Sequence, residues 1–279
     1  MSPEIRPMTR DDLSHVLDWA ADEGWNPGQS DAAHFIGADP EGFLMALHDG
    51  APAAAVSVVR VGPEHAFLGL FLCRADLRGR GLGTAVWTSG LARVNGASVG
   101  LDGVVAQQES YGRAGFQRHH ATLRFAGSVP APAGRLVSRP FSEADLADAL
   151  ALDTAATGFA RAPFLTGWLK NAPDRHVRAI HIGGHLAGYA AMRRCRVGWK
   201  IGPLHARDET VARRLLDDLV VLAEGAQIML DVPDCNAPAL AAAEALGLSQ
   251  VFETARMWTG PAPGGDTALE YGVCTLELG

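Results

Sequence analysis

Three alternating glycines near residue 80 are the feature of this sequence that points most directly to chemistry. An apolar run of strand character ends at Cys73, a polar turn follows, and Gly79, Gly81 and Gly83 open a segment with helical spacing. The predicted order is therefore strand, glycine-rich loop, helix. Amides with no side chain in front of them, placed where a helix dipole begins, bind phosphate groups. The stretch predicts a site for a phosphate-bearing ligand.

The spacing of these glycines excludes two nucleotide-binding motifs. A P-loop requires Lys and Ser or Thr directly after the last glycine, whereas Thr84 and Ala85 follow Gly83, and a dinucleotide fingerprint requires a glycine at position 84. The motif that fits is Arg78-x-x-Gly81-x-Gly83, which resembles the acetyl-CoA loop of the GNAT superfamily of acyltransferases.

The resemblance implies that the loop amides hold the pyrophosphate of CoA and that the preceding strand pairs with the pantetheine arm. The alternative is a glycine turn that only lets helix and strand pack closely. The residues expected on this basis to bind acetyl-CoA are Phe71, Leu72, Cys73, Arg78, Gly79, Arg80, Gly81, Leu82, Gly83 and Thr84.

A tyrosine in the segment 111–116 is the candidate general acid. Acyl transfer from a thioester to an amine needs a held thioester, an unprotonated amine and a proton for the departing thiolate. The segment reads YGRAGF and resembles a GNAT motif whose tyrosine commonly acts as a general acid near the thioester sulfur. Tyr111 is therefore expected to protonate CoA. The alternative is an aromatic anchor that packs a short helix onto the sheet.

The group that accepts the proton of the amine is less well determined. GNAT enzymes often carry a glutamate on the strand before the glycine loop, but residues 66–71 contain no carboxylate. Asp22 and Glu23, at the end of the first predicted helix, are the substitutes, because that loop borders the acceptor pocket in the family. A solvated helix end explains them equally well, and a water chain is a third possibility. Trp25 and Asn26 are expected to line the acceptor site, or else to pin a turn.

Composition excludes several classes of function. With 48% hydrophobic and 20% charged residues and a formal charge of −7, the chain reads as globular and carries no basic footprint for nucleic acid. The four cysteines lie far apart, which favours reduced thiols and a cytoplasmic location. No signal core and no membrane-spanning run are found. No metal is expected, because the two histidine pairs lack zinc spacing.

The 279 residues favour two domains of one plan. Residues 1–126 follow the GNAT order β-α-α-β-β-β-α-β-α-β, residues 127–134 read as a linker rich in Pro, Gly and Ala, and residues 135–279 repeat the plan. Thr9 with Asp12, and Ser142 with Asp145, predict capped helix starts in the two halves, and Ser30 can cap a second short helix through Ala38. The predicted fold class is α/β (α+β), with two tandem GNAT-like domains. Each domain is expected to hold a central mixed, mostly antiparallel sheet flanked by helices.

The second copy has lost the chemical features of the first. Asp208, Glu209 and Thr210 stand where the first copy has its glycines, and Ala243 stands in place of Tyr111. One active copy and one degenerate copy are therefore expected. The predicted function is transfer of an acetyl group from acetyl-CoA to a primary amine of a small molecule or peptide by direct attack. The alternative is a CoA-binding sensor or interaction module without turnover, and the oligomeric state is left open.

Overall fold

The first half of the chain follows the predicted order of elements. The computed structural model describes residues 3–130 and 135–279. The first half consists of β1 (Glu4–Pro7), α1 (Arg10–Asp22), α2 (Asp31–Phe35), β2 (Phe43–His48), β3 (Ala51–Arg60), β4 (His65–Cys73), α3 (Leu82–Arg93), β5 (Ser98–Val104), α4 (Gln108–Arg113) and β6 (Gln117–Ser128).

The second half repeats this plan and adds a short strand after it. Its elements are β7 (Arg139–Pro140), α5 (Leu146–Thr157), α6 (Ala162–Trp168), β8 (Arg175–Ile182), β9 (His185–Arg194), β10 (Trp199–Ala206), α7 (Glu209–Leu222), β11 (Gln227–Pro233), α8 (Ala237–Ala245), β12 (Ser249–Trp258) and β13 (Glu270–Gly272).

Local capping signals set several helix starts. Thr9 and Asp12 form the predicted capping box before α1, each side chain bonding the other's backbone amide. Ser142 and Asp145 do the same ahead of α5. The prediction was wrong for α2, because Ser30 makes no side-chain cap and the helix ends at Phe35 rather than near residue 38.

All the strands belong to one sheet that runs through both halves. The order is β1-β2-β3-β4-β5-β12-β6-β11-β10-β9-β8-β7, with β13 added beside β10. Among the pairings that the structure describes, β4 with β5 and β10 with β11 are parallel and the others are antiparallel. The two domain sheets are therefore mixed and mostly antiparallel, as predicted, and are joined edge to edge.

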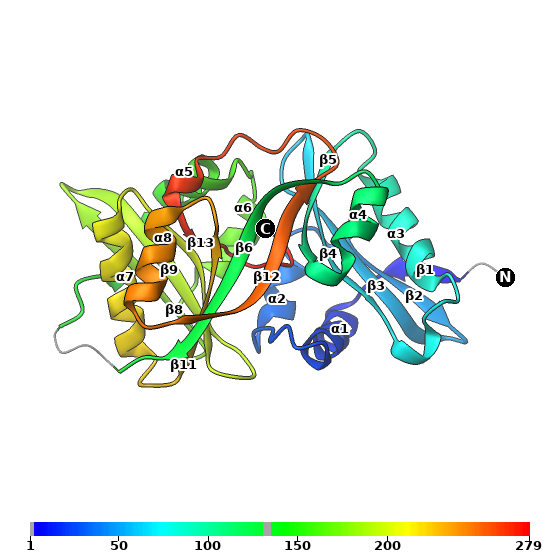
Figure 1. Cartoon of the computed structure of the whole chain (residues 1–279), viewed down its shortest axis with the longest axis horizontal. Coiled ribbons are helices and arrows are strands. Elements are labelled where there is room, and N and C mark those ends of the chain that lie inside the picture. The colour runs from blue at the N-terminus through cyan, green and yellow to red at the C-terminus, as the bar shows by residue number, and fades with distance from the viewer. Residues whose placement is uncertain (1–2, 131–134) are drawn as a thin grey trace.

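The halves exchange their last strands. β12, from the second half, pairs with β5 of the first, and β6, from the first half, pairs with β11 of the second. β6 and β12 also pair with each other, and Figure 1 shows them side by side across the middle of the molecule. Each half thus completes the sheet of the other.

The expected linker at 127–134 begins later than predicted. Gly127 and Ser128 belong to β6, where they pair with Ile228 and Gln227. Hydrogen bonding to β11 extends the strand past the position where the composition changes. Residues 131–134 of the predicted linker lie outside the described residues.

Three large hydrophobic cores and one small cluster are found among the described residues. Successive residues of β2 alternate between faces, so Phe43 and Met45 enter one core and Leu44 and Ala46 another. The core that contains Phe43 also holds Trp168 and other residues of α5 and α6. This core is shared by the two halves, whereas α3 and α7 each cover a separate core.

Candidate active site

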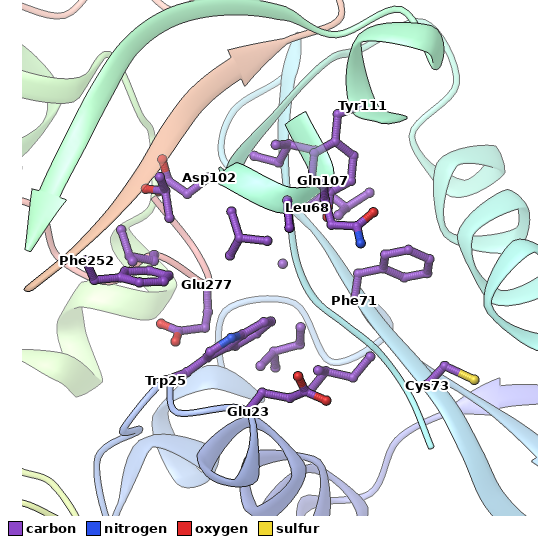
Figure 2. Close-up of a pocket in the computed structure, with 18 of the residues that line it drawn as sticks. Glu23, Trp25, Leu68, Phe71, Cys73, Asp102, Gln107, Tyr111, Phe252 and Glu277 are labelled. Carbon is purple, nitrogen blue, oxygen red and sulfur yellow. The ribbon is translucent and has the colours of Figure 1, made fainter. Parts of the chain in front are cut away.

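A pocket of about 390 Å³ lies where β4 and β5 separate. The two strands pair in parallel from His65 with Ser98 to Leu68 with Leu101, and the pairing stops there. The rest of β4, residues 69–73, and of β5, residues 102 and 104, lines the opening (Figure 2). The volume is in the range of small-molecule sites.

A β-bulge shapes β4 at this opening. The register with β3 shifts between Ala55, which faces Leu72, and Ser57, which faces Gly69, so Leu70 and Phe71 stand opposite one residue. Leu70 has a φ of +45°, a conformation that is unfavourable for a branched side chain. Such backbone strain is concentrated at functional sites. Here the bulge leaves one β4 residue unpaired with β3, next to the pocket.

The glycine loop has the geometry of an anion cradle. Gly79 and Gly81 have φ values of +80° and +79°, and a Cβ added to either would meet no atom within 4 Å. Gly81 is the N-cap of α3 and provides no side chain to bond the first amides of the helix. These amides are available to a pyrophosphate, so the residues present fit CoA. Gly83 differs from these two glycines, because a Cβ there would make an ordinary van der Waals contact with the ring of Phe71, at 3.4 Å.

The ten residues predicted to bind acetyl-CoA divide into two groups. Four of them line the pocket, and the loop and helix start that follow lie outside its lining. Arg80 and Thr84 are exposed, and the side chain of Leu82 is buried in the core beneath α3, which leaves its amide as the part that can contact a ligand. The four lining residues are Phe71, Leu72, Cys73 and Arg78.

Arg78 and Glu23 face each other at the pocket. Their side chains form an ion pair at 2.5 Å, and Arg78 Nε also donates to the carbonyl oxygen of Cys73 at 3.1 Å. Glu23 lies at the end of α1, as predicted, but its carboxylate is half exposed and engaged by the arginine. The pair ties α1 to the glycine loop, which makes Glu23 a poor candidate for the proton acceptor.

Tyr111 lines the pocket from α4 and is held by aromatic neighbours. Its ring stacks on Trp87 of α3 at 5.9 Å between centroids, and Trp87 contacts Phe71 edge-on at 5.0 Å. Burial raises the pKa of Tyr111, so the phenol stays protonated at neutral pH. Among the described residues no hydrogen bond to its hydroxyl is found, which leaves that proton free for a ligand. Trp87 was not singled out from the sequence.

Trp25 and Asn26 are separated by the fold. Trp25 lines the pocket, and its carbonyl oxygen accepts hydrogen bonds from Arg124 at 3.2 Å and Lys200 at 3.2 Å. The prediction for Asn26 was wrong. Its side-chain Nδ2 donates to the carbonyl oxygen of Val197 at 2.9 Å, and its Oδ1 accepts from the backbone amide of Val197 at 3.0 Å. Asn26 does not line the pocket. It holds the α1–α2 loop against the second half.

The second half supplies one end of the pocket. Phe252 and Thr254 come from the exchanged strand β12, and Leu276 and Glu277 from the segment 270–279. In Figure 2, Trp25, Phe252 and Glu277 lie on one side of the pocket, and Phe71 and Cys73 on the other. Nothing in the sequence marked these second-half residues, because strand exchange brings Phe252 and Thr254 to the pocket and a separate long-range contact brings Glu277 to Gly69 of β4.

Comparisons with known proteins show the family to which the chain belongs. Residues 10–116 match the model of the acetyltransferase (GNAT) family, and residues 149–272 match a second acetyltransferase (GNAT) domain model. The holothin acyltransferase of Pseudoalteromonas sp. (strain SANK 73390) is 30% identical over 279 residues, which cover 98% of this chain and 94% of the relative. The chain belongs to the GNAT family of acyltransferases. It is a tandem GNAT protein.

Solved structures show the same fold as this GNAT protein. A putative acetyltransferase from Pyrococcus horikoshii superposes with a TM-score of 0.82 at 22% identity, covering 100% of this chain and 96% of that one. A tandem GNAT protein from the clavulanic acid biosynthesis pathway gives 0.63 at 18% identity, covering 93% and 99%.

The second GNAT copy is closed at both places where the first is open. Asp208 caps α7 by accepting from the amide of Val211 at 2.9 Å, so its carboxylate occupies the start of the helix. β10 and β11 pair in parallel only as far as Ile201 and Leu230. Beyond that point β13 pairs with β10, and the amide of Val273 donates to the backbone carbonyl oxygen of Asp231 in β11 at 2.8 Å. The chain itself fills the second cleft.

Two findings bear on the wider class of this GNAT protein. Within residues 3–130 and 135–279, no group of three or more His, Cys, Asp or Glu side chains is arranged to hold a metal ion. No helix in the same ranges has the length and apolar character needed to cross a membrane.

Proposed function

We propose that this protein transfers an acetyl group from acetyl-CoA to a primary amine by direct attack, with no covalent enzyme intermediate. The observation that carries the proposal is the pocket itself, which has the open loop of residues 78–83 next to it, Tyr111 in its wall and second-half residues at its far end. Acetyl-CoA, when bound, supplies the reactive thioester carbonyl.

The protein's own residues have three tasks under this proposal. The amides of Gly79 to Thr84 bind the pyrophosphate, and the uncovered α3 dipole favours its negative charge. The bulged end of β4 aligns the pantetheine arm. Tyr111 donates a proton to the thiolate as it leaves, which the raised pKa of its phenol permits at neutral pH.

A small-molecule amine suits the site better than a long peptide. The end of the pocket opposite Phe71 is lined by Trp25, Phe252, Leu276 and Glu277, and these side chains limit the size of an acceptor that fits beside them. The 30% identical relative is named for acyl transfer to holothin, which makes holothin one acceptor to test.

The test is release of free CoA thiol from acetyl-CoA. The purified protein is assayed with holothin, polyamines, amino acids, benzylamine and lysine peptides. We expect a slow background rate that at least one small amine accelerates strongly, with the acetylated amine identified by mass. Acetyl-CoA binding with no acceleration by any amine would indicate a sensor or interaction module instead.

A further inference from the structure

The strand that often carries the GNAT carboxylate has none here, yet three carboxylates from elsewhere line the pocket. Two of them are already engaged. Glu23 pairs with Arg78, and Asp102 is held by the guanidinium of Arg256 at 2.8 and 2.9 Å. The third is Glu277. Among the described residues, no Lys, Arg or His nitrogen lies within 4.0 Å of its carboxylate.

The segment 270–279 fixes Glu277 against the reactive part of β4. A Cβ added at Gly69 would come within 2.9 Å of the Cα of Glu277, so the glycine allows direct backbone contact. Gly69 is the residue before the strained Leu70 of the bulge. The hydroxyl of Thr275 donates to the Glu277 carboxylate and holds its rotamer. Glu277 is therefore placed next to the β4 bulge by contacts of its own segment.

The surroundings of Glu277 suit an organic cation. The residue is 5% exposed, and leaving a carboxylate buried without an ionic partner is costly. Arg124, Arg193 and Lys200 lie within electrostatic range, but each is bound elsewhere: Arg124 to Asp231, Arg193 to Asp31 and Lys200 to a backbone oxygen. The aromatic rings of Trp25 and Phe252 line the same end of the pocket. Aromatic faces with a carboxylate are the chemistry that recognises an alkylammonium group.

We propose that Glu277 binds the ammonium form of the acceptor and accepts its proton, so that the second GNAT copy supplies the carboxylate that β4 of the first copy lacks. The inference rests on the proposed function. The ammonium gives one proton to Glu277, which passes it to solvent. The neutral nitrogen then bonds to the thioester carbon and the carbon–sulfur bond breaks.

The remaining protons balance through Tyr111. Tyr111 gives its phenol proton to the departing thiolate. As the amide forms, the nitrogen loses its second proton, and this proton restores the phenol of Tyr111. The products are the amide, the CoA thiol and one proton in solvent.

The test compares Glu277→Gln with wild type on two kinds of acceptor. Benzylamine is an ammonium ion at pH 7 and requires deprotonation, whereas aniline is already neutral. We expect Glu277→Gln to lower kcat/KM for benzylamine by about 10²-fold or more and that for aniline by less than about threefold. The residual benzylamine rate of the variant should rise about tenfold per pH unit, following the free amine.

The matched control is Glu253→Gln. Glu253 is partly buried on β12 between the lining residues Phe252 and Thr254, but it does not line the pocket. The control should keep wild-type rates with both amines. The affinity of both variants for acetyl-CoA, measured by calorimetry, should match wild type, which verifies the fold of the first copy.

The outcomes separate this inference from the proposed function. If Glu277→Gln loses kcat/KM equally for benzylamine and aniline, or loses it for neither, the proposed role of Glu277 is wrong, while acyl transfer stays in place. Equal losses together with lost acetyl-CoA affinity would mean that Glu277 only supports the structure. A wild-type protein that no amine stimulates would overturn the proposed function itself.

Discussion

At the scale of single residues, the chemistry depends on which polar groups the packing leaves free. Tyr111 is fixed by stacking on Trp87, and no hydrogen bond to its hydroxyl is found among the described residues. The other two tyrosines, Tyr189 and Tyr271, belong to the second half and do not line the pocket. The phenol of Tyr111 is therefore the one we expect to serve as an acid.

Replacing Tyr111 by Phe keeps the stacking and removes the proton. We expect kcat to fall by about 10²-fold while KM for acetyl-CoA changes little, because the hydroxyl acts in the transition state. Steady-state kinetics with the best amine of the panel measures this. The matched control is Tyr271→Phe, a buried tyrosine of β13 outside the pocket. Wild-type kcat in Tyr111→Phe would show that the residue only packs α4.

At the scale of elements, the two copies differ in how their loop helices begin. α3 starts at a glycine with a free αL backbone, and α7 starts at an aspartate whose side chain bonds its own helix. The same helix dipole is open to a ligand in the first case and satisfied internally in the second.

A side chain at position 81 should close the cradle. In Gly81→Glu, a carboxylate occupies the pyrophosphate position, and we expect calorimetry to detect almost no acetyl-CoA binding. The control is Gly96→Glu, since Gly96 shares the positive φ (+87°) and the open surroundings but lies in the turn between α3 and β5. The control carries the same backbone strain without the cradle. Unchanged affinity in folded Gly81→Glu would mean that the loop is purely structural.

The second cleft should bind no CoA. Asp208 covers the start of α7 and β13 occupies the gap between β10 and β11, so both steric and electrostatic terms oppose a pyrophosphate there. Titration of wild-type protein with acetyl-CoA should give a stoichiometry near one per chain. If wild type binds a second acetyl-CoA per chain, and Gly81→Glu still binds that molecule, this account of β13 is wrong.

At the scale of the whole molecule, strand exchange makes the two halves one cooperative unit. The buried pair of Asp102 on β5 and Arg256 on β12 joins the halves, and Asp102 is fully buried beside the pocket. Unfolding either half removes a strand from the other. Urea denaturation of the wild type is therefore expected to show a single transition.

Breaking that pair should weaken both halves together. Arg256→Met leaves an uncompensated buried carboxylate, and we expect a loss of about 3–5 kcal/mol in the free energy of unfolding, still in one transition. Asp102→Asn combined with Arg256→Met should recover much of this loss. Two separate transitions, with only one shifted by Arg256→Met, would show that the halves unfold independently.

The sequence by itself determined the local features of this protein. The strand, glycine loop and helix of residues 70–93, the capping boxes at Thr9 and Ser142 and the degenerate second copy were all predicted, because each depends on residues close together in the chain. Backbone conformation and capping are short-range effects, and an amide cradle of contiguous residues leaves a readable pattern.

Only the tertiary structure decided which distant residues meet at the pocket. β6 and β12 are both antiparallel partners of suitable length, and no local pattern tells which of them pairs with β5. That pairing brings Phe252 to the pocket. Two further long-range contacts tie Asn26 to Val197 and place Glu277 against Gly69 of β4. Long-range pairing is selected by the packing of whole faces, and this is why Trp25 could be predicted from the sequence as a pocket residue but the second-half residues beside it could not.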